Sequence, residues 1–402
     1  MDSHFRKLFN AAYRDSVYAR YVGEMSRRLG VTFNFRNAET PVFVPRALLA
    51  RLISSADAIL AQLMAPALIE RTKAYIPPRW NTPGLNELTT FTMIDFAIVR
   101  GPDGELVPRL IELQGFPSLT ALQVYKRDCW TELLAQMPGL DVPWSCWPGG
   151  HTRDQFVELA RQTIVGDHDP QHVIMMDLDP PGQGTYPDFV ATKQLFGVEP
   201  VCPTALEKQG NRLFRRVDGR LVPVKRIYNR VVFDELARSP LKLPFDYRDE
   251  LDVEWTPHPN WFFIWSKAAM PFLDHPDAPR TLLVSEVSEP PADLDQYVLK
   301  PLFSFSGGGV VMTPTPADLA RIPVEERAGW CLQRKVEYAP VVVNPAGEGI
   351  KCEIRMMYLK PPGAEKPILA LNLARLARGL LIGTAFNRDF TWVGSTVGLW
   401  PA

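Results

Sequence analysis

An acidic hairpin pattern near position 100 constrains this chain more than any other feature. Strand-like alternation over residues 88–123 is interrupted by Gly101-Pro102-Asp103-Gly104, a typical hairpin turn. With the turn centred on Asp103-Gly104, Asp95 faces Glu112, and Gln114 follows on the same face. The other face carries apolar side chains and predicts a core stripe: Ile94, Phe96, Ile98, Ile111 and Leu113.

The two facing acids need a physical explanation. Carboxylates on opposite strands, with Cβ atoms roughly 5 Å apart, repel each other and destabilise a hairpin. A hard divalent cation removes that penalty, and Mg²⁺ commonly takes one or two carboxylates together with phosphate oxygens. The local pattern leaves one alternative open, a solvent-exposed hairpin face with two hydrated acids. A three-residue loop would also change the register and separate the pair.

A glycine-rich segment late in the chain is the second informative pattern. In YVLKPLFSFSGGGVVM, Lys300 lies near the end of an apolar strand, and the glycines are followed by a second predicted strand, VVM. Consecutive glycines let backbone N–H groups approach an anion, and a lysine supplies a point charge for phosphate. No GK[ST] opens a helix here, so the pattern differs from the nucleotide-binding P-loop. An ordinary glycine-rich turn is the alternative.

The rest of the chain divides by its periodicity into four predicted regions. Residues 1–87 read as helices, with apolar positions at helical spacing after Pro45. Residues 88–150 contain the hairpin, and residues 151–254 read as a small α/β lobe. This lobe has a buried strand (HVIMMDL), a helix over ATKQLFG, a hairpin turning at Asp218-Gly219, a strand over KRIYNRVV and a short acidic helix. Residues 255–402 contain a helix near Lys267 and strands at LLVSEV, YVLKPL, GWCLQRKVEY, CEIRMMYL and ILALNLARL.

Composition excludes several function classes. A formal net charge of −1 gives no reason to expect nucleic-acid or membrane-surface binding. Five scattered cysteines favour free, mostly buried thiols in a reducing compartment. The charged N-terminal segment does not resemble a signal peptide, and the apolar stretch 47–68 is too polar to span a bilayer. We therefore expect a cytoplasmic protein, and its oligomeric state is left open by the sequence.

Taken together, these segments resemble the circularly permuted ATP-grasp proteins, whose best-known relatives are the glutathionylspermidine synthase-like ligases. IELQGFPSLTAL is similar to that family's metal-binding strand, in which an acid, one intervening residue and an amide residue precede a proline and a small hydroxyl residue. The resemblance implies Asp95, Glu112 and Gln114 as the magnesium ligands. The family usually has asparagine where this chain has Gln114. It also tends to have arginine where this chain has Met93.

Other segments resemble the ATP-binding parts of the same family. WFFIWSKAAMPFL is similar to the segment with the first ATP-binding lysine, YVLKPLFSFSGGGV to the second lysine and phosphate-covering loop, and CLQRKVEYAP to the strand beside the adenine. The resemblance implies these ATP-binding residues: Lys267, Lys300, Ser306, Gly307, Gly308, Gly309, Gln333, Lys335 and Glu337. IYNRVVFDEL is similar to a segment just before the ATP-grasp lobes, where Arg230 would face substrate. Arg230 and Arg355 are therefore the candidates to replace the arginine missing at Met93.

The resemblance implies a fold and an activity. The fold is α/β (α+β), an ATP-grasp domain in circularly permuted order with a Rossmann-like lobe before the ATP-grasp lobes. The activity is that of an ATP- and Mg²⁺-dependent ligase, which joins a small-molecule or peptide carboxylate to an amine through an acyl phosphate. Arginine and asparagine on the last strands suit carboxylate or phosphate binding, or ordinary surface and strand-edge pairing: Arg355, Asn372, Arg375 and Asn387.

Three rival functions follow from the same residues. Met93 and Gln114 favour a nucleotide-binding protein with weak or no ligase activity. The same fold also suits phosphotransfer to a small molecule. A nicotinamide-dependent enzyme on the middle lobe is disfavoured, because PGQGTYP has only two spaced glycines and lacks the full dinucleotide-binding fingerprint.

Overall fold

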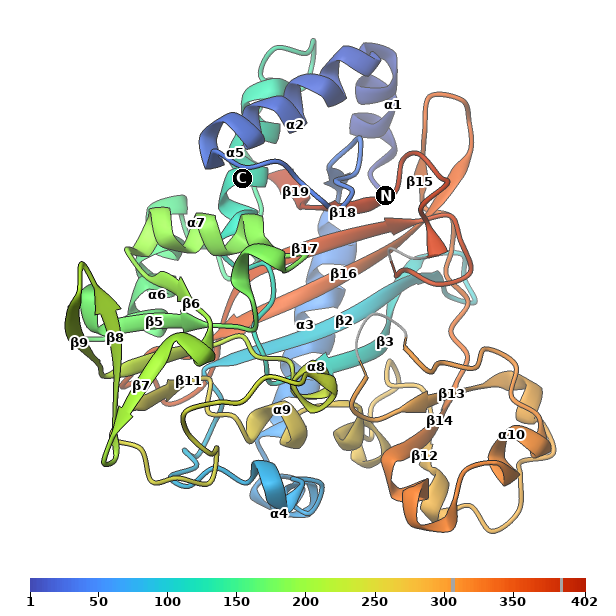
Figure 1. Ribbon diagram of the computed structural model, residues 1–402. Helices are drawn as coiled ribbons and strands as arrows, with labels where there is room; N and C mark the ends of the chain where they lie inside the picture. The colour runs from blue at the N-terminus through green and yellow to red at the C-terminus, as the bar shows by residue number, and fades with distance from the viewer. Residues whose placement is uncertain (305–307, 384–385) are drawn as a thin grey trace.

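The computed structural model describes residues 1–304, 308–383 and 386–402, and a long antiparallel sheet lies at its centre (Figure 1). The strand order is β18-β17-β16-β2-β3, and β15 pairs beside β16. The strands are β2 (Phe91–Arg100), β3 (Leu106–Gln114), β15 (Val342–Val343), β16 (Gly349–Leu359), β17 (Ile368–Ala377) and β18 (Gly394–Thr396). Because β16 pairs with β2, the early hairpin and the late strands of the chain form one sheet.

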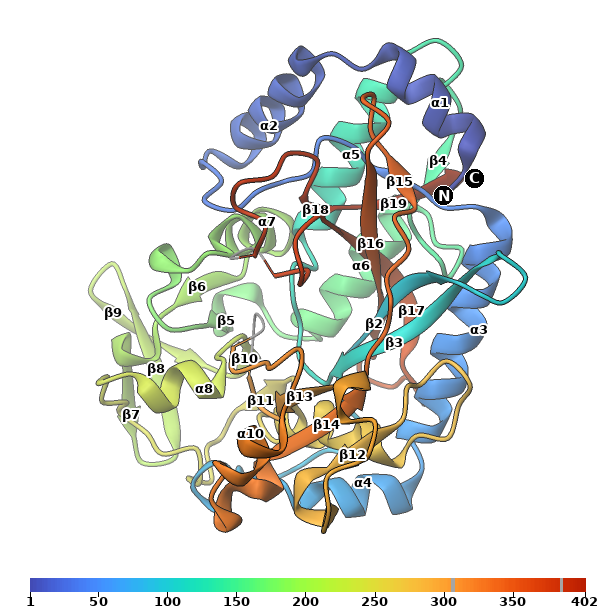
Figure 2. The ribbon, with the colours of Figure 1, turned by 90° about the vertical axis from the view of Figure 1, so that its right-hand side faces the viewer.

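Helix α3 (Arg46–Leu63) packs against one face of this sheet (Figures 1 and 2). Its buried apolar side chains recur at the predicted helical spacing: Leu48, Leu52, Ala56, Ile59, Leu60 and Leu63. Pro45, expected at the helix start, is the N-cap. Helix α4 (Pro66–Lys73) follows after a bend of 67°. Within the described residues no single helix is long and apolar enough to cross a membrane, although α3 and α4 pass that test as a bent pair.

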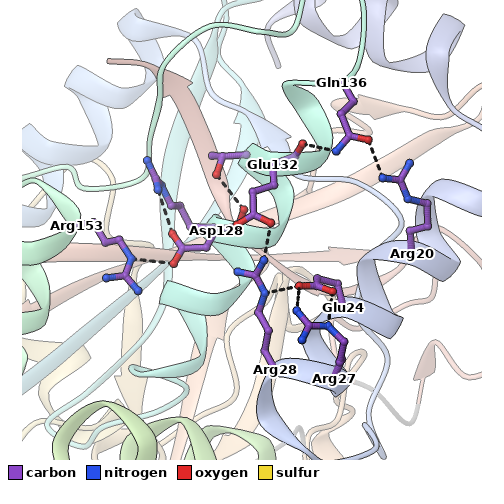
Figure 3. Close-up of polar contacts among 10 residues, drawn as sticks. Arg20, Glu24, Arg27, Arg28, Asp128, Glu132, Gln136 and Arg153 are labelled. Atoms are coloured by element: carbon purple, nitrogen blue, oxygen red, sulfur yellow. Dashed lines mark hydrogen bonds and ion pairs between the residues drawn. The ribbon is translucent and has the colours of Figure 1, made fainter.

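Helix α2 (Asp15–Leu29) docks on α5 (Leu122–Leu134), and Phe9 of α1 (Ser3–Ala12) packs edge-on against Trp130 of α5. Tyr21 stacks on Trp130 with ring centroids 4.1 Å apart. Figure 3 shows polar contacts between α2 and α5, where Arg28 of α2 bonds to both Glu24 and Glu132. The apolar stack supplies most of the docking energy, because exposed ion pairs contribute little.

The middle of the chain forms the predicted α/β lobe around a parallel sheet of order β11-β10-β5-β6. Its strands are β5 (Val173–Met176), β6 (Glu199–Val201), β10 (Arg226–Asn229) and β11 (Glu254–Thr256). The lobe's helices are α6 (Arg153–Ile164), α7 (Tyr186–Phe196) and α8 (Phe233–Arg238). A separate small sheet contains β7 (Leu206–Gln209), β8 (Arg212–Val217) and β9 (Arg220–Val224), and the predicted turn at Asp218-Gly219 is confirmed.

The section that carries the lysines forms a third unit, a small antiparallel sheet of order β12-β14-β13. Its strands are β12 (Thr281–Leu283), β13 (Tyr297–Pro301) and β14 (Trp330–Arg334). The predicted helix near Lys267 is α9 (Trp261–Ile264) followed by a 3₁₀-helix (Lys267–Phe272), and α10 (Pro316–Ala320) follows later. The strand predicted over VVM is wrong, because only an isolated bridge joins Val311 to Leu299.

Strands from three distant parts of the chain pair in one further small sheet. β1 (Val42–Phe43), β4 (Trp144–Ser145) and β19 (Gly398–Pro401) form a small sheet of order β1-β19-β4. All five cysteines are free thiols, and four of them are buried, as the cysteine count predicted: Cys129, Cys146, Cys331 and Cys352.

The docking of the N-terminal helices generates a stability prediction. Trp130→Ala removes a fully buried side chain and its stacking contact with Tyr21, so the free energy of unfolding should fall by about 3–5 kcal/mol. Arg27→Ala, on the exposed side of α2, should change it by less than about 1 kcal/mol. Urea denaturation followed by circular dichroism measures both. Equal losses in the two variants would contradict the view that the apolar stack holds these helices.

Candidate functional site

The register of the β2–β3 hairpin brings its two acids face to face. Near the turn, Arg100 pairs with Leu106, one position away from the predicted register. The register shifts between Asp95 and Phe96, where Ile111 is the extra residue of a bulge. Beyond the bulge Asp95 lies opposite Glu112, and Gln114 lies opposite Met93. The predicted pairing of Asp95 with Glu112 is therefore confirmed. The turn is longer than predicted and shifts the register by one residue, and the bulge shifts it back.

The bulge also changes one predicted core position. Ile94, Phe96, Ile98 and Leu113 are buried, as predicted. Ile111 instead lines a cleft, and its carbonyl oxygen accepts a hydrogen bond of 3.2 Å from Gln333 of β14. The prediction of Ile111 as a core residue is wrong, because the extra residue at the bulge no longer follows the alternation of the strand.

Asp95 is 1% exposed, and arginines occupy both of its oxygens. Arg355 donates from Nε to Oδ1 at 2.5 Å and from Nη2 to Oδ2 at 2.6 Å, and Arg375 donates from Nη2 to Oδ2 at 2.5 Å. The strand register requires this contact, since Arg355 of β16 pairs directly with Asp95. Burial alone raises the pKa of Asp95, but the charges of both arginines outweigh it and hold that pKa below its usual value.

Arg375 joins this pair to a second buried carboxylate. It bonds to Glu353, which lies directly across from it on β16 and also accepts a hydrogen bond of 2.7 Å from the Tyr338 hydroxyl. Burial raises the pKa of the Glu353 carboxyl, against the opposing charge of Arg375. The sequence patterns did not indicate Glu353 or Tyr338 as site residues. The signal for Glu353 was its position two residues before Arg355, on the same face of one strand.

Glu112 is the hairpin acid that remains available. Its Oε1 accepts a hydrogen bond of 2.9 Å from Gln114, and its Oε2 lies 3.9 Å from Lys267 Nζ. Arg355 Nη2 is 4.0 Å from Glu112 Oε1, so its guanidinium lies between the two facing acids. This arrangement differs from the one expected for the magnesium set of Asp95, Glu112 and Gln114. A guanidinium stands where a cation shared by Asp95 and Glu112 was expected, and both oxygens of Asp95 are occupied.

A niche of about 20 Å³ borders Glu112 and Gln114, together with Lys267 and Ser304. This volume accommodates one water-sized species. A carboxylate and an amide oxygen are suitable donors for one Mg²⁺ that also binds phosphate oxygens. Glu112 and Gln114 therefore fit a magnesium ion, and Asp95 does not. Within the described residues, no three His, Cys, Asp or Glu side chains are grouped to hold a metal unaided.

A cleft of about 580 Å³ opens between the central sheet and the lysine-bearing sheet. Its wall includes Glu112 from the early hairpin and Lys267 and Lys300 from the late section. Lys267 Nζ donates to the carbonyl oxygen of Ser304 at 2.9 Å, and Lys300 bonds to the amide oxygen of Gln333. Burial lowers the pKa of Lys300, and the charge of Glu112 opposes that change.

The segment predicted to lie beside an adenine does line this cleft, although its strand β14 ends at Arg334 and not at Tyr338 as predicted. Gln333, Lys335 and Glu337 all belong to its wall. Lys335 Nζ donates to the carbonyl oxygen of Asp295 at 2.5 Å, which holds that side chain across the strand ends. Apolar side chains line the same cleft: Val298, Val310, Met312, Val336, Leu380, Leu381 and Ile382. An apolar slot with a few polar groups is typical of sites for flat organic ligands.

The glycine loop is described in part. Ser306 and Gly307, two of the predicted ATP-binding residues, lie outside the described residues. Gly309 has φ +72°, and a Cβ atom there would lie 2.8 Å from the side chain of Pro301. This position therefore requires glycine for conformation and for space. Gly308 and Gly309 are not in the cleft wall, whereas Ser304 and Val310 on either side of the loop are.

Arg230, one of the two candidate catalytic arginines, lies away from this cleft. It is 4% exposed in the parallel-sheet lobe and forms an ion pair of 2.7 Å with Asp188. The backbone N–H of Leu122 donates to the same Asp188 carboxylate. Arg230 therefore does not take the position of Met93, whereas Arg355 and Arg375 both meet the neighbouring Asp95.

The two asparagines considered on the last strands have structural partners. Asn372 bonds to the backbone of Cys146 and Gly398, and Asn387 accepts from two backbone N–H groups and donates to two carbonyls within its own loop. These contacts explain both side chains without a ligand.

The fold places the chain in a class of mixed α/β proteins with several sheets. It matches the structure of a glutathione synthetase-like effector from Globodera pallida, in its apo form, with a TM-score of 0.61 at 13% identity. The match covers 96% of this chain and 96% of that one, so the two share their overall fold. No protein-family profile and no curated protein matches the sequence.

The buried pair of Arg230 and Asp188 yields a prediction. Arg230→Met leaves the buried Asp188 carboxylate without its counter-charge and should reduce the free energy of unfolding by about 3–5 kcal/mol. Adding Asp188→Asn should restore part of this loss, because the amide oxygen still accepts from Leu122. Urea denaturation at neutral pH measures all three chains. If Arg230→Met alone were as stable as the wild type, the ion pair would have no structural role.

Proposed function

We propose that this chain is an ATP-grasp ligase in circularly permuted order, which uses ATP and Mg²⁺ to join a carboxylate to an amine. The observation that supports this most directly is the cleft itself. Glu112, early in the chain, lines one space of about 580 Å³ together with Lys267 and Lys300, late in the chain. That volume suits a nucleotide-sized ligand. The fold shared with a glutathione synthetase-like effector agrees with this proposal.

ATP would lie with its base among the apolar residues beside Gln333, Lys335 and Glu337. Its phosphates would meet Lys267 and Lys300 and the loop that contains Ser306, Gly307, Gly308 and Gly309. Lysines act as point charges for phosphate, and glycine backbone N–H groups can approach its oxygens closely. This arrangement explains why two lysines converge on one wall of the cleft.

Glu112 and Gln114 would hold the magnesium ion, which neutralises charge on the phosphates of ATP. The protein's own contribution to the reaction is to position groups and to supply charge. Such terms dominate phosphoryl transfer, which needs no nucleophilic side chain. A carboxylate oxygen of the substrate displaces ADP from the γ-phosphorus, and the amine then displaces phosphate from the acyl group. Lys267 and Lys300 would balance the negative charge in the first of these steps.

The substrates belong to the same proposal. A small-molecule or peptide carboxylate and an amine are the expected pair, and neither nucleic acid nor membrane is expected as a partner. A cytoplasmic location agrees with the free cysteines, which need no oxidising compartment.

One alternative has an observation in its favour. A nucleotide-binding protein with weak or no ligase activity would explain Met93, Gln114 and the arginine contacts that occupy Asp95. A small-molecule phosphotransferase would use the same cleft but would give no amide. Product analysis separates these functions.

The acyl phosphate gives the sharpest chemical test. With ATP, Mg²⁺, hydroxylamine and a panel of amino acids and small peptides, the chain should produce a hydroxamate and ADP in equal amounts. Hydroxylamine captures the activated acyl group, so the native amine need not be known. ADP release without hydroxamate would support phosphotransfer or simple hydrolysis. Release of neither product across the panel would leave the binding-only alternative as the better account.

Nucleotide binding gives a second test, by thermal shift. Mg-ATP at a hundredfold excess over its Kd should stabilise the wild type by about 2.7 kcal/mol. Glu112→Ala and Lys300→Ala should lose this stabilisation, because each removes a charge from the cleft wall. Lys208→Ala, which breaks only a surface pair with Asp249, is the matched control and should respond like the wild type. Identical responses in all four chains would place the nucleotide elsewhere.

A further inference from the structure

We propose that Asp95 is not a magnesium ligand but the anchor of two arginines, and that Arg375 uses this anchor to bind the phosphoryl group during transfer. This inference rests on the proposed function and changes the roles within its site. The metal would bind at Glu112 and Gln114 alone. The cation between the two facing acids would be the guanidinium of Arg355, in every state of the site.

The first step is the geometry at Asp95. A carboxylate can be shared by a metal only if one of its oxygens is open. Arg355 holds both oxygens in a bidentate fork, and Arg375 adds a third bond to Oδ2. Strand register fixes both arginines. Arg355 of β16 pairs with Asp95 of β2, and Arg375 of β17 pairs with Glu353 of β16. Releasing Asp95 to a metal would leave the Arg355 guanidinium, 4% exposed, without that counter-charge.

The second step is the unused capacity of Arg375. Only its Nη2 forms hydrogen bonds within the described residues, to Asp95 and Glu353. Its Nε is buried without a partner. The side chain is 31% exposed and belongs to the cleft wall that also contains Glu112, Lys267 and Lys300. A fixed guanidinium with free N–H donors at a cleft wall is suited to a phosphate or carboxylate oxygen.

Met93 occupies the position where an arginine was expected. The side chain at this position is fully buried and apolar, so it brings no charge to the hairpin. The strands beside the hairpin bring two arginines to Asp95 instead, one from β16 and one from β17. The positive charge therefore arrives from neighbouring strands. Asp95 and Glu353 fix its position, as a pair of carboxylates can fix a planar guanidinium.

Crystals of the wild type with Mn²⁺ and a non-hydrolysable ATP analogue provide the direct test. We expect the anomalous signal of Mn²⁺ about 2 Å from a Glu112 oxygen, with Asp95 still bonded to Arg355 and a free donor of Arg375 on the terminal phosphate. Mn²⁺ coordinated by Asp95, with Arg355 displaced, would overturn the proposal. A terminal phosphate without contact to Arg375 would overturn its second half.

Variants test the same roles in solution, by the Mg²⁺ concentration that gives half-maximal nucleotide binding. Glu112→Gln should raise this concentration at least about tenfold. Arg375→Gln should leave it within about twofold, yet lower kcat about a hundredfold. Asp95→Asn should follow Arg375→Gln. A shift in Mg²⁺ dependence for Asp95→Asn as large as that for Glu112→Gln would contradict the anchor role.

Arg375→Lys separates charge from geometry, and it disturbs folding less than Arg375→Gln because it keeps a positive charge beside the buried Asp95 and Glu353. It retains one charge without the planar fork, so its kcat should lie between those of the wild type and Arg375→Gln. The metal and binding measurements need no turnover. A wild type that binds Mn²⁺ and nucleotide but releases no ADP would refute the ligase and leave the metal assignment standing.

Discussion

The buried bond between Asp95 and Arg355 is the interaction on which the arrangement of this site depends. An ionised carboxylate with 1% exposure is tolerated only when opposite charge and hydrogen bonds surround it. Arg355 supplies both, and Arg375 extends the contact to Glu353. Because these residues lie on β2, β16 and β17, one charge network joins the early hairpin to the last long strands. A one-residue slip of β16 would turn Arg355 toward the opposite face of the sheet.

This network fixes one wall of the cleft, and the small lysine-bearing sheet forms the other. Two of the following contacts join the walls, and the bond between Lys300 and Gln333 lies within the lysine-bearing sheet. Gln333 donates to Ile111 at the hairpin bulge, Lys300 bonds to that same Gln333, and Lys267 lies 3.9 Å from Glu112. The bulge therefore has two effects, because it faces Glu112 toward Asp95 and also exposes the carbonyl that Gln333 reaches. A single extra residue in β3 links the acid register to the docking of the lysines.

The sequence predicted the elements better than their contacts. The hairpin and its facing acids, helix α3, the parallel-sheet lobe and the strand with Lys300 all follow from periodicity and turn residues. The bulge at Ile111 could not be predicted, because one extra residue does not visibly change the alternation of apolar and polar residues along the strand. The partners of Asp95 were also hidden, since Arg355 lies 260 positions away and only the sheet order brings it near.

Reasoning from one hairpin alone correctly identified that the facing acids required a cation. It assigned that role to magnesium because facing carboxylates suit a hard divalent cation, whereas Arg355 and Arg375, which meet Asp95, lie on distant strands. The segment around Arg230 made that residue a candidate for the site. Its ion pair with the buried Asp188, 42 positions earlier, could not be recognised from the sequence. Both differences arise from long-range ion pairing, which residue spacing does not encode.

The central claim is that the cleft between hairpin and lysine sheet binds a nucleotide. Photolabelling with azido-ATP, followed by mapping of the modified peptide, tests it most directly because the azido group reports the position of the base. We predict labelling within residues 330–338, competed by Mg-ATP, since residues 333–338 line the cleft. Competable labelling on the parallel-sheet lobe, within residues 173–201, would contradict the account.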